Sequence, residues 1–257
     1  MTLPEIKAQL DQGALFVVNH SGGKDSQAMM IHVQKQVPRE HLLVVHATLG
    51  RFEWPLALEH AQQQADDANV EFMVAEAGKT FFEMVERRFE KRPESPCWPS
   101  SSTRQCTSDL KRNPIQKLVR HYMKAHGFTN AVNCLGLRAQ ESASRAKKSC
   151  FQCNKTLSKA GRIVDDWLPI HKLSTQQVIQ TVKDNGQHLH YAYEKGNDRL
   201  SCKLCIFANS KDLQNGANED PELYIEYCQR EVDTGYTMHM SRKSLPELTG
   251  IQPVKWV

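Results

Sequence analysis

The chain has 257 residues, of which 40% are hydrophobic and 24% charged, a composition typical of a globular protein that buries a sizeable core. No stretch approaches the roughly 20 apolar residues that a membrane-crossing helix needs, and the polar start MTLPEIKAQLDQG is unlike a secretory signal, so we expect a cytoplasmic protein with no membrane partner. The net charge of +4 conceals a basic middle third, because residues 87–162 hold 17 Lys and Arg against 4 Asp and Glu. This imbalance favours nucleotide phosphates or a nucleic acid as partner, with solvated helix faces as the alternative.

Apolar runs alternate with helical patterns along the chain. Strands are predicted at residues 16–18, 42–45, 72–74, 131–137 and 167–170. Helices are predicted at residues 28–33, 54–68, 81–89 and 114–124. Such alternation predicts an α/β fold, in which a parallel twisted sheet carries helices on both faces.

Two segments and the C-terminal part depart from this alternation. Residues 91–107 are rich in Pro and Ser, and residues 144–162 are basic and polar, so both are predicted to be loops or lids. The alternation of predicted strands and helices weakens from residue 190 onward. We therefore expect a nucleotide-binding α/β domain over residues 1–190, with a small C-terminal lobe over residues 191–257 that packs on it.

The segment SGGKDS, residues 21–26, follows the first predicted strand directly and opens a helix. At the carboxyl end of a parallel strand, a helix N-terminus can receive an anion. Glycines allow close approach to a phosphate, the serines offer hydroxyl groups, and the lysine offers a mobile positive charge. The spacing differs from both GxxxxGK[ST] and GxGxxG. We predict a phosphate-binding loop made of Ser21, Gly22, Gly23, Lys24, Asp25 and Ser26.

SGGKDS is the signature of the PP-loop ATP pyrophosphatase superfamily, and the chain resembles the phosphoadenosine-phosphosulfate reductase branch of it. NCLGLRAQESASR (residues 133–145) is similar to the Gly-[IL]-Arg-x-x-Glu-Ser-x-x-Arg segment of that branch, and DWLPIHKLSTQQV resembles its W-x-P-[IL] segment. RLSCKLCIF (residues 199–207) resembles the late Cys-x-x-Cys of its iron–sulfur members. The resemblance covers about residues 14–240 and implies an adenine nucleotide alpha-hydrolase-like fold.

The resemblance also implies ATP and Mg²⁺ as cofactors, with the loop around the phosphates. The other side of the nucleotide site would be closed by Gly136, Arg138, Glu141 and Arg145. Lys24, Asp25, Arg138 and Arg145 would be catalytic, with either arginine neutralising the charge that develops as pyrophosphate leaves. A salt bridge from these arginines to Glu141 within one helix is the alternative. After the second strand no acid comes before Glu53, and His46 lies nearest the strand end, where it would help to bind the nucleotide.

Eight cysteines in a chain without an export signal favour reduced thiols, metal ligation or redox chemistry over disulfides. The two CxxC pairs, 150/153 and 202/205, are separated by 48 residues, too far for a zinc ribbon. TRQCTSDLKRNP resembles the first cysteine element of iron–sulfur members, with Thr107 where a second cysteine would stand. The resemblance implies a [4Fe–4S] cluster, with zinc or plain reduced thiols as alternatives, at Cys97, Cys106, Cys202 and Cys205.

The remaining cysteines bear on the reaction. Cys134 is expected in the core, and Cys150 and Cys153 are either an extra redox pair or bystanders. A sulfonucleotide reductase of this branch needs a mobile cysteine near its C-terminus, but no cysteine follows Cys228, which is expected to pack in a helix.

In its missing C-terminal cysteine and its basic middle third, the chain resembles the DndC- and SspD-type ATP pyrophosphatases of DNA phosphorothioation and their phage-encoded relatives. That resemblance implies an enzyme that converts ATP to AMP and pyrophosphate, activates the DNA backbone, and receives sulfur from a cysteine desulfurase. Two alternatives remain. One is a sulfonucleotide reductase with Cys228 or Cys153 as nucleophile, and the other is an enzyme that thiolates tRNA.

Overall fold

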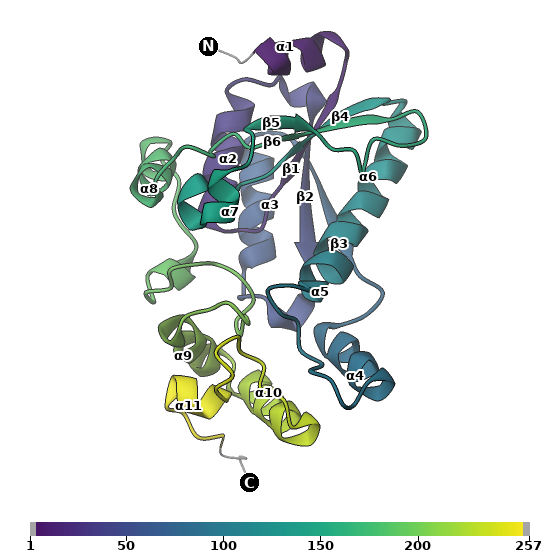
Figure 1. Cartoon of the computed structure of the whole chain (residues 1–257). Coiled ribbons are helices and arrows are strands. Elements are labelled where there is room, and N and C mark those ends of the chain that lie inside the picture. The colour runs from purple at the N-terminus through teal and green to yellow at the C-terminus, as the bar shows by residue number, and fades with distance from the viewer. Residues whose placement is uncertain (1–3, 254–257) are drawn as a thin grey trace. The chain divides into compact units, whose positions relative to one another are not determined.

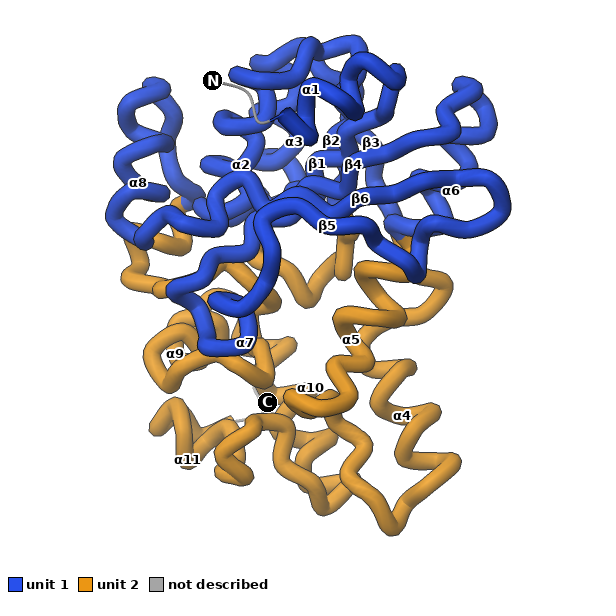
Figure 2. The backbone as a smooth tube through the Cα atoms, turned by 45° about the horizontal axis from the view of Figure 1, so that its top comes forward, with its two compact units in different colours: residues 1–46, 56–75, 115–190 blue, residues 47–55, 76–114, 191–257 orange. Residues whose placement is uncertain are grey.

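The structure is a computed structural model that describes residues 4–253 (Figure 1). Within these residues the chain forms two compact units, coloured separately in Figure 2. Of the described residues, unit 1 takes in 4–46, 56–75 and 115–190, and unit 2 takes in 47–55, 76–114 and 191–253. The segments 47–55 and 76–114 were expected in the first domain, but they group with the C-terminal residues. No helix among residues 4–253 is long and apolar enough to cross a bilayer.

A six-stranded sheet carries unit 1, in the order β3-β2-β1-β4-β6-β5. The strands are β1 (Leu15–Asn19), β2 (Leu42–Thr48), β3 (Glu71–Glu76), β4 (Asn130–Cys134), β5 (Phe151–Cys153) and β6 (Ile163–Trp167). Strand β1 pairs in parallel with β2 and β4, β4 pairs in parallel with β6, and β5 pairs antiparallel with β6. The predicted α/β fold with a parallel sheet is therefore confirmed, except that the edge strand β5 runs antiparallel to β6.

Two strand predictions need correction. The fifth strand was predicted at residues 167–170, but β6 ends at Trp167, which pairs with the last residue of β4, Cys134. Strand β5 lies inside the segment 144–162, which was predicted as a loop. The first error arises because the sequence of β6, IVDDW, carries two acids, and acids are depleted in strands.

Helices cover both faces of the sheet in unit 1. They are α1 (Pro4–Asp11), α2 (Lys24–Gln34), α3 (Ala57–Asp67), α6 (Asn113–His126), α7 (Ala143–Ala146) and α8 (Thr175–Asp184). Because successive side chains of a strand alternate between faces, Phe16 and Val18 of β1 pack in one core with α2 and α8. Leu15 and Val17 face the other way and pack with α6, to which Met123 belongs.

The helix starts are set by local chemistry. The helix predicted at residues 54–68 begins only at Ala57, because Leu56 before it has a left-handed backbone with φ of +64°. Helix α8 begins at a capping box, in which the Ser174 hydroxyl accepts from the Gln177 N–H and the Gln177 side chain accepts from the Ser174 N–H. Helix α1 was not predicted.

Unit 2 is built on an aromatic core. Its helices are α4 (Phe81–Lys91), α5 (Gln105–Thr107), α9 (Ser210–Glu219), α10 (Pro221–Thr234) and α11 (Leu245–Thr249). The buried ring of Tyr227 on α10 stacks on Trp98 at a centroid distance of 5.8 Å and meets Phe82 of α4 edge-on at 4.7 Å. Phe52 meets Phe82 at 4.9 Å, so three separate stretches of the chain share this core.

Candidate nucleotide site

The segment SGGKDS connects β1 to α2 (residues 24–34) in a tight turn. Gly22 has φ of +75°, and a Cβ atom there would lie 2.5 Å from the carbonyl oxygen of Ala57, so only glycine fits. Gly136 packs from the other side, because its Cβ would lie 3.2 Å from the backbone of Asp25. No side chain caps the start of α2 at Gly23. This arrangement suits an anion, which a helix N-terminus attracts.

Internal hydrogen bonds fix the loop. The Ser26 hydroxyl donates to the Gly23 carbonyl oxygen at 2.8 Å and accepts from the Ser21 N–H at 3.2 Å. Ser26 is buried, whereas Ser21 is exposed. The two serines of the motif therefore differ: one holds the loop in shape and the other faces solvent.

Two buried histidines contact the backbone of the loop and of the residue before it. The Gly22 N–H donates to Nδ1 of His20 at 3.1 Å, and Nε2 of His20 lies 3.0 Å from Oε1 of Gln64. The Nδ1 atom of His46 lies 2.9 Å from the His20 carbonyl oxygen. The structure thus places His46, predicted as a nucleotide contact, against the backbone of the loop. Sequence reasoning missed His20, although it directly precedes the motif.

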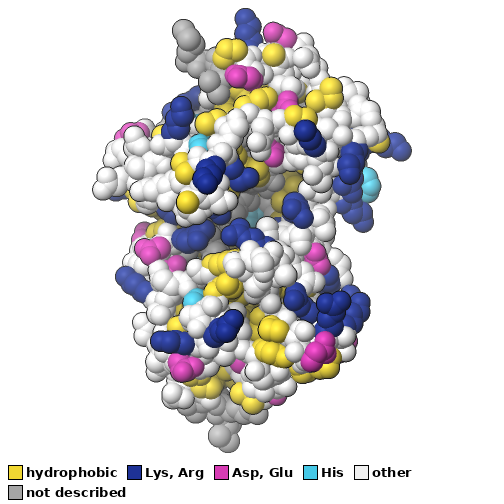
Figure 3. Space-filling model, viewed as in Figure 1, with side chains coloured by type: hydrophobic (Ala, Val, Ile, Leu, Met, Phe, Trp, Pro, Cys, Tyr) yellow, Lys and Arg dark blue, Asp and Glu magenta, His cyan; other side chains and the backbone are white. Residues whose placement is uncertain are grey.

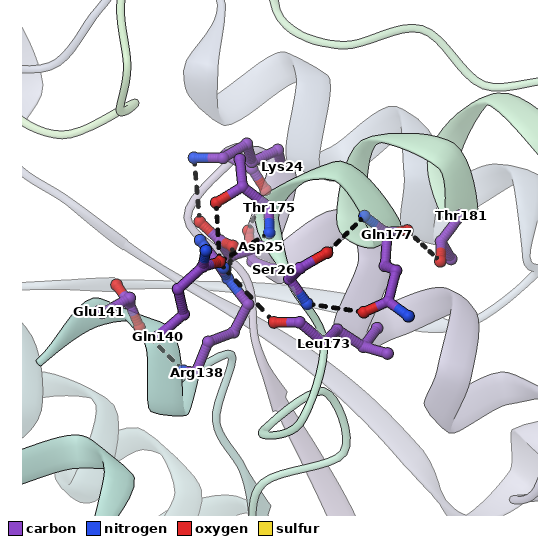
Figure 4. Close-up of polar contacts among 12 residues, drawn as sticks. Lys24, Asp25, Ser26, Arg138, Gln140, Glu141, Leu173, Thr175, Gln177 and Thr181 are labelled. Carbon is purple, nitrogen blue, oxygen red and sulfur yellow. Dashed lines mark hydrogen bonds and ion pairs between the residues drawn. The ribbon is translucent and has the colours of Figure 1, made fainter. Parts of the chain in front are cut away.

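The charged side chains of the site converge on Asp25 (Figure 4). Nε of Arg138 lies 2.6 Å from one carboxylate oxygen of Asp25, and Nζ of Lys24 lies 3.3 Å from the other. Both cations are buried, and a quarter of the Asp25 side chain is exposed. Two cations share one carboxylate at the start of α2, where they could also stabilise a phosphate.

Arg138 is held on its remaining sides. Its Nη1 donates to Oε1 of Gln140 at 3.0 Å, and its N–H donates to Oε2 of Glu141 at 2.8 Å. The same Gln140 oxygen accepts from the N–H of Thr175 at 2.9 Å, which ties the segment to the start of α8 (Figure 4). The guanidinium group of Arg138 is therefore positioned before any ligand binds.

The alternative, a salt bridge from both arginines to Glu141 within one helix, holds only for Arg145, and the three residues do not share one helix. A 3-10 turn over Ala139–Glu141 is separated from α7 by Ser142, whose extended backbone has φ of −172°. The Arg145 side chain pairs with Glu141, whereas the Arg138 side chain pairs with Asp25. Of the two arginines, Arg138 is therefore the one that reaches the phosphate loop.

The burial of His20 makes stability depend on pH. Burial lowers the pKa of His20 from 6.5 to about 3. Because this pKa is lower in the folded state than in the unfolded state, the contribution to stability is complete above pH 6.5 and is lost as the pH falls toward 3. Between about pH 7.5 and about pH 5, the wild-type free energy of unfolding should fall by about 2 kcal/mol more than that of His20→Gln, which cannot titrate. Urea unfolding at both pH values measures this difference.

The control for this experiment is His121→Gln, at an exposed position on α6. This variant should keep the wild-type pH dependence. Equal losses in wild type and His20→Gln would show that His20 does not carry the effect.

The predicted cluster cysteines are partly brought together in unit 2. The thiols of Cys106, Cys202 and Cys205 are close enough to act on one another electrostatically, with Lys111 beside them. Burial raises the pKa of Cys202 to about 12 and that of Cys106 above its usual range, which favours neutral thiols in this arrangement.

Cys97 is the exception in this set. It is buried in the aromatic core, where its thiol interacts with Thr234. Within residues 4–253, no three Cys, His, Asp or Glu side chains are arranged to hold a metal ion. The described geometry does not fit a four-thiolate cluster.

The other cysteines divide by burial. Cys134 is fully buried in β4, as expected for a core residue. Cys228 is buried in α10, and burial raises its pKa to about 11, which disfavours the thiolate that a nucleophile requires. Cys153 on β5 is exposed, and Cys150 lies 3.6 Å from Nδ1 of His171 through its Sγ.

Comparisons with known proteins show the family of the chain. A family model described as the phosphoadenosine phosphosulfate reductase domain matches residues 16–208. An uncharacterized protein of Methanocaldococcus jannaschii is 24% identical over 212 residues, which cover 82% of this chain but only 40% of that protein.

Two solved structures match this chain at low sequence identity. A phosphoadenylyl-sulfate reductase from Candida auris, in a phosphate complex, matches 79% of this chain and 88% of its own at 12% identity and a TM-score of 0.51. An NH3-dependent NAD synthetase from Campylobacter jejuni, in complex with a nitrate ion, matches 98% of this chain and 94% of its own at 12% identity and a TM-score of 0.42. The first of these supports the α/β fold described above.

Proposed function

Because the chain belongs to the phosphoadenosine phosphosulfate reductase domain family, we propose that its phosphate loop binds ATP and that the protein is an ATP pyrophosphatase. It would convert ATP to AMP and pyrophosphate while activating a substrate for sulfur insertion. The observation that carries this proposal is the arrangement of Lys24 and Arg138 about Asp25 at the start of α2. Both cations are positioned where a triphosphate would displace the carboxylate as their partner.

The residues present suit each part of the first step. An oxygen of the acceptor attacks the α-phosphorus, the bond from that phosphorus to the bridging oxygen breaks, and pyrophosphate leaves. Lys24 and Arg138 neutralise the charge that develops on the departing phosphates, which preorganised donors do without reorganisation. The quarter-exposed carboxylate of Asp25 can hold Mg²⁺, which would shield the phosphate charges.

We propose the DNA backbone as the acceptor, as in phosphorothioate modification. A backbone phosphate oxygen would take the adenylyl group. The terminal sulfur of a cysteine desulfurase persulfide would then attack the backbone phosphorus and displace AMP, and a thiol reductant would cleave the resulting S–S bond to leave the phosphorothioate. The basic balance of residues 87–162 supports a polyanionic acceptor, and tRNA would satisfy the same charge requirement.

One observation keeps a second function open. Cys153 is exposed on β5, whereas Cys228 is buried, so a sulfonucleotide reductase built on this chain would use Cys153. Its thiolate would attack the sulfonate sulfur and release the nucleotide, and a dithiol donor would then free sulfite.

Product analysis separates the two functions. Anaerobically purified protein incubated with Mg-ATP, DNA and a cysteine desulfurase should form AMP and pyrophosphate in equal amounts, and Lys24→Ala should abolish both products. Phosphoadenosine phosphosulfate with a dithiol should yield no sulfite. Sulfite release that disappears in Cys153→Ser, without AMP formation from ATP, would establish the reductase instead.

A further inference from the structure

Unit 1 contains a cavity that shares no residue with the phosphate loop. It has a volume of about 280 Å³ and lies between α6, the strands β1, β4 and β6, and the turn that joins β5 to β6. Its walls are aliphatic, formed by Val17, Val119, Met123 and Leu157 among others. Ligand cavities in proteins are typically about 300–1,000 Å³, so this one suits a single small ring system with a polar substituent.

Polar side chains enter the cavity at defined positions. Asn133 is held across the sheet, because its Oδ1 accepts from Nδ2 of Asn19 at 2.7 Å and its Nδ2 donates to Asp166 at 2.8 Å. Gln116 and Thr156 also line the cavity, and neither side chain makes a hydrogen bond to another described residue. Their donor and acceptor groups are therefore available to a ligand.

The cavity has a strongly positive lining. Arg120 of α6 and Lys159 and Arg162 of the β5–β6 turn line it, and no Asp or Glu does. None of the three cations pairs with a carboxylate among residues 4–253. The turn reverses at Ala160 and Gly161, both with positive φ, which brings Lys159 and Arg162 to the same cavity.

The surroundings extend this positive charge. Helix α6 also carries the exposed Lys117 and Lys124, and the β5–β6 turn carries Lys155. In the space-filling view, Lys and Arg side chains gather over α6 (Figure 3). An anion bound at the cavity would therefore lie in a wider field of the same sign.

We propose that this cavity is a second nucleotide-binding site, which holds one nucleobase between its aliphatic walls and the attached phosphate on Arg120, Lys159 and Arg162. Gln116 and Thr156 hydrogen-bond the edge of the base. Aliphatic walls alone would suit many apolar ligands, but three unpaired cations select one that carries an anion. A free mononucleotide and one nucleotide unit of a single strand offer the same chemistry, and the wider basic field favours the strand.

The test measures binding of two probes, thymidine monophosphate by equilibrium dialysis and a fluorescein-labelled single-stranded oligothymidylate by anisotropy. Arg120→Glu should weaken binding of the strand at least about tenfold and reduce the slope of log affinity against log salt. The matched control is Lys124→Glu, the same charge change at an exposed position on the same helix outside the cavity. Its effect should stay below about threefold, as expected for diffuse attraction.

A second variant tests the base itself. Gln116→Leu removes the amide without changing charge and should weaken both probes several-fold. Binding of both probes that depends on Arg120 supports a strand partner, and binding of the monophosphate alone supports a free nucleotide. Equal weakening by Arg120→Glu and Lys124→Glu, no effect of Gln116→Leu, or no binding of either probe would overturn the site.

The phosphate loop provides the remaining control. Lys24→Ala should keep the part of probe binding that depends on Arg120, because Lys24 lies outside the cavity. If probe binding is lost in Lys24→Ala and kept in Arg120→Glu, the probes bind at the phosphate loop. That result would overturn the second site and leave the proposed ATP chemistry intact. Conversely, absence of AMP formation leaves this binding test unaffected.

Discussion

Replacing Arg138 by methionine should lower kcat/KM for ATP conversion about 10²- to 10³-fold, the usual consequence of removing one preorganised charge from a transition state. Its side chain is buried and lies 2.6 Å from Asp25 through Nε, and its removal would leave that carboxylate with Lys24, which lies 3.3 Å away. Arg145→Met removes the other candidate arginine, which pairs with Glu141, and should reduce the rate far less. Steady-state release of pyrophosphate measures both variants.

A double-mutant cycle tests whether Arg138 and Asp25 act as one unit. Asp25→Asn combined with Arg138→Met should cost less than the sum of the single changes, because each single change already breaks the shared ion pair. Full additivity, or a larger loss for Arg145→Met than for Arg138→Met, would contradict the geometry of the site. Arg138→Lys should restore only part of the activity, because lysine cannot contact Asp25 and Gln140 at once.

The second large effect is expected at Gly22. Gly22→Ala combines a positive φ of +75° with a Cβ placed 2.5 Å from the Ala57 carbonyl oxygen. Left-handed strain costs about 1–2 kcal/mol for alanine, and overlap with fixed backbone adds about 1–3 kcal/mol. The free energy of unfolding should therefore fall by about 2–5 kcal/mol, and ATP binding should be lost because the turn must move.

The control for Gly22→Ala is Gly13→Ala. Gly13 has nearly the same φ, +68°, but nothing lies within 4 Å of the position of its Cβ. Its variant reports the backbone strain alone, and we expect a loss of about 1 kcal/mol. If urea unfolding shows that the two variants lose similar free energy of unfolding, the contact with Ala57 adds no measurable cost and this prediction is wrong.

The α/β fold was predictable because its strands alternate with amphipathic helices in a regular rhythm. The rhythm failed at β6, where Asp165 and Asp166 interrupt an apolar run. The strand tolerates these carboxylates because side-chain amides donate hydrogen bonds to them. Gln9 donates to Asp165 at 2.8 Å, and Asn133 donates to Asp166 at the same distance. Such long-range partners cannot be read from a local window.

The candidate site shows a similar division. SGGKDS and GLRAQES are contiguous, so their residues were found, and the structure brings Asp25 and Arg138 into contact. His20 was missed because a histidine beside a loop carries no signal of its own, and only the fold reveals its contact with the Gly22 N–H. The composition of unit 2 was equally hidden, because aromatic residues at positions 52, 82 and 227 give no sign that they meet.

The aromatic core of unit 2 has a consequence for the order in which the chain matures. Phe52 and Phe82 leave the ribosome well before Tyr227, which packs against both rings. Every segment of unit 1 is already synthesised at residue 190, so its sheet can close while the partners of these rings are still missing. Nascent chains therefore expose apolar rings for the time needed to translate the last quarter of the protein, the interval in which chaperones are most needed.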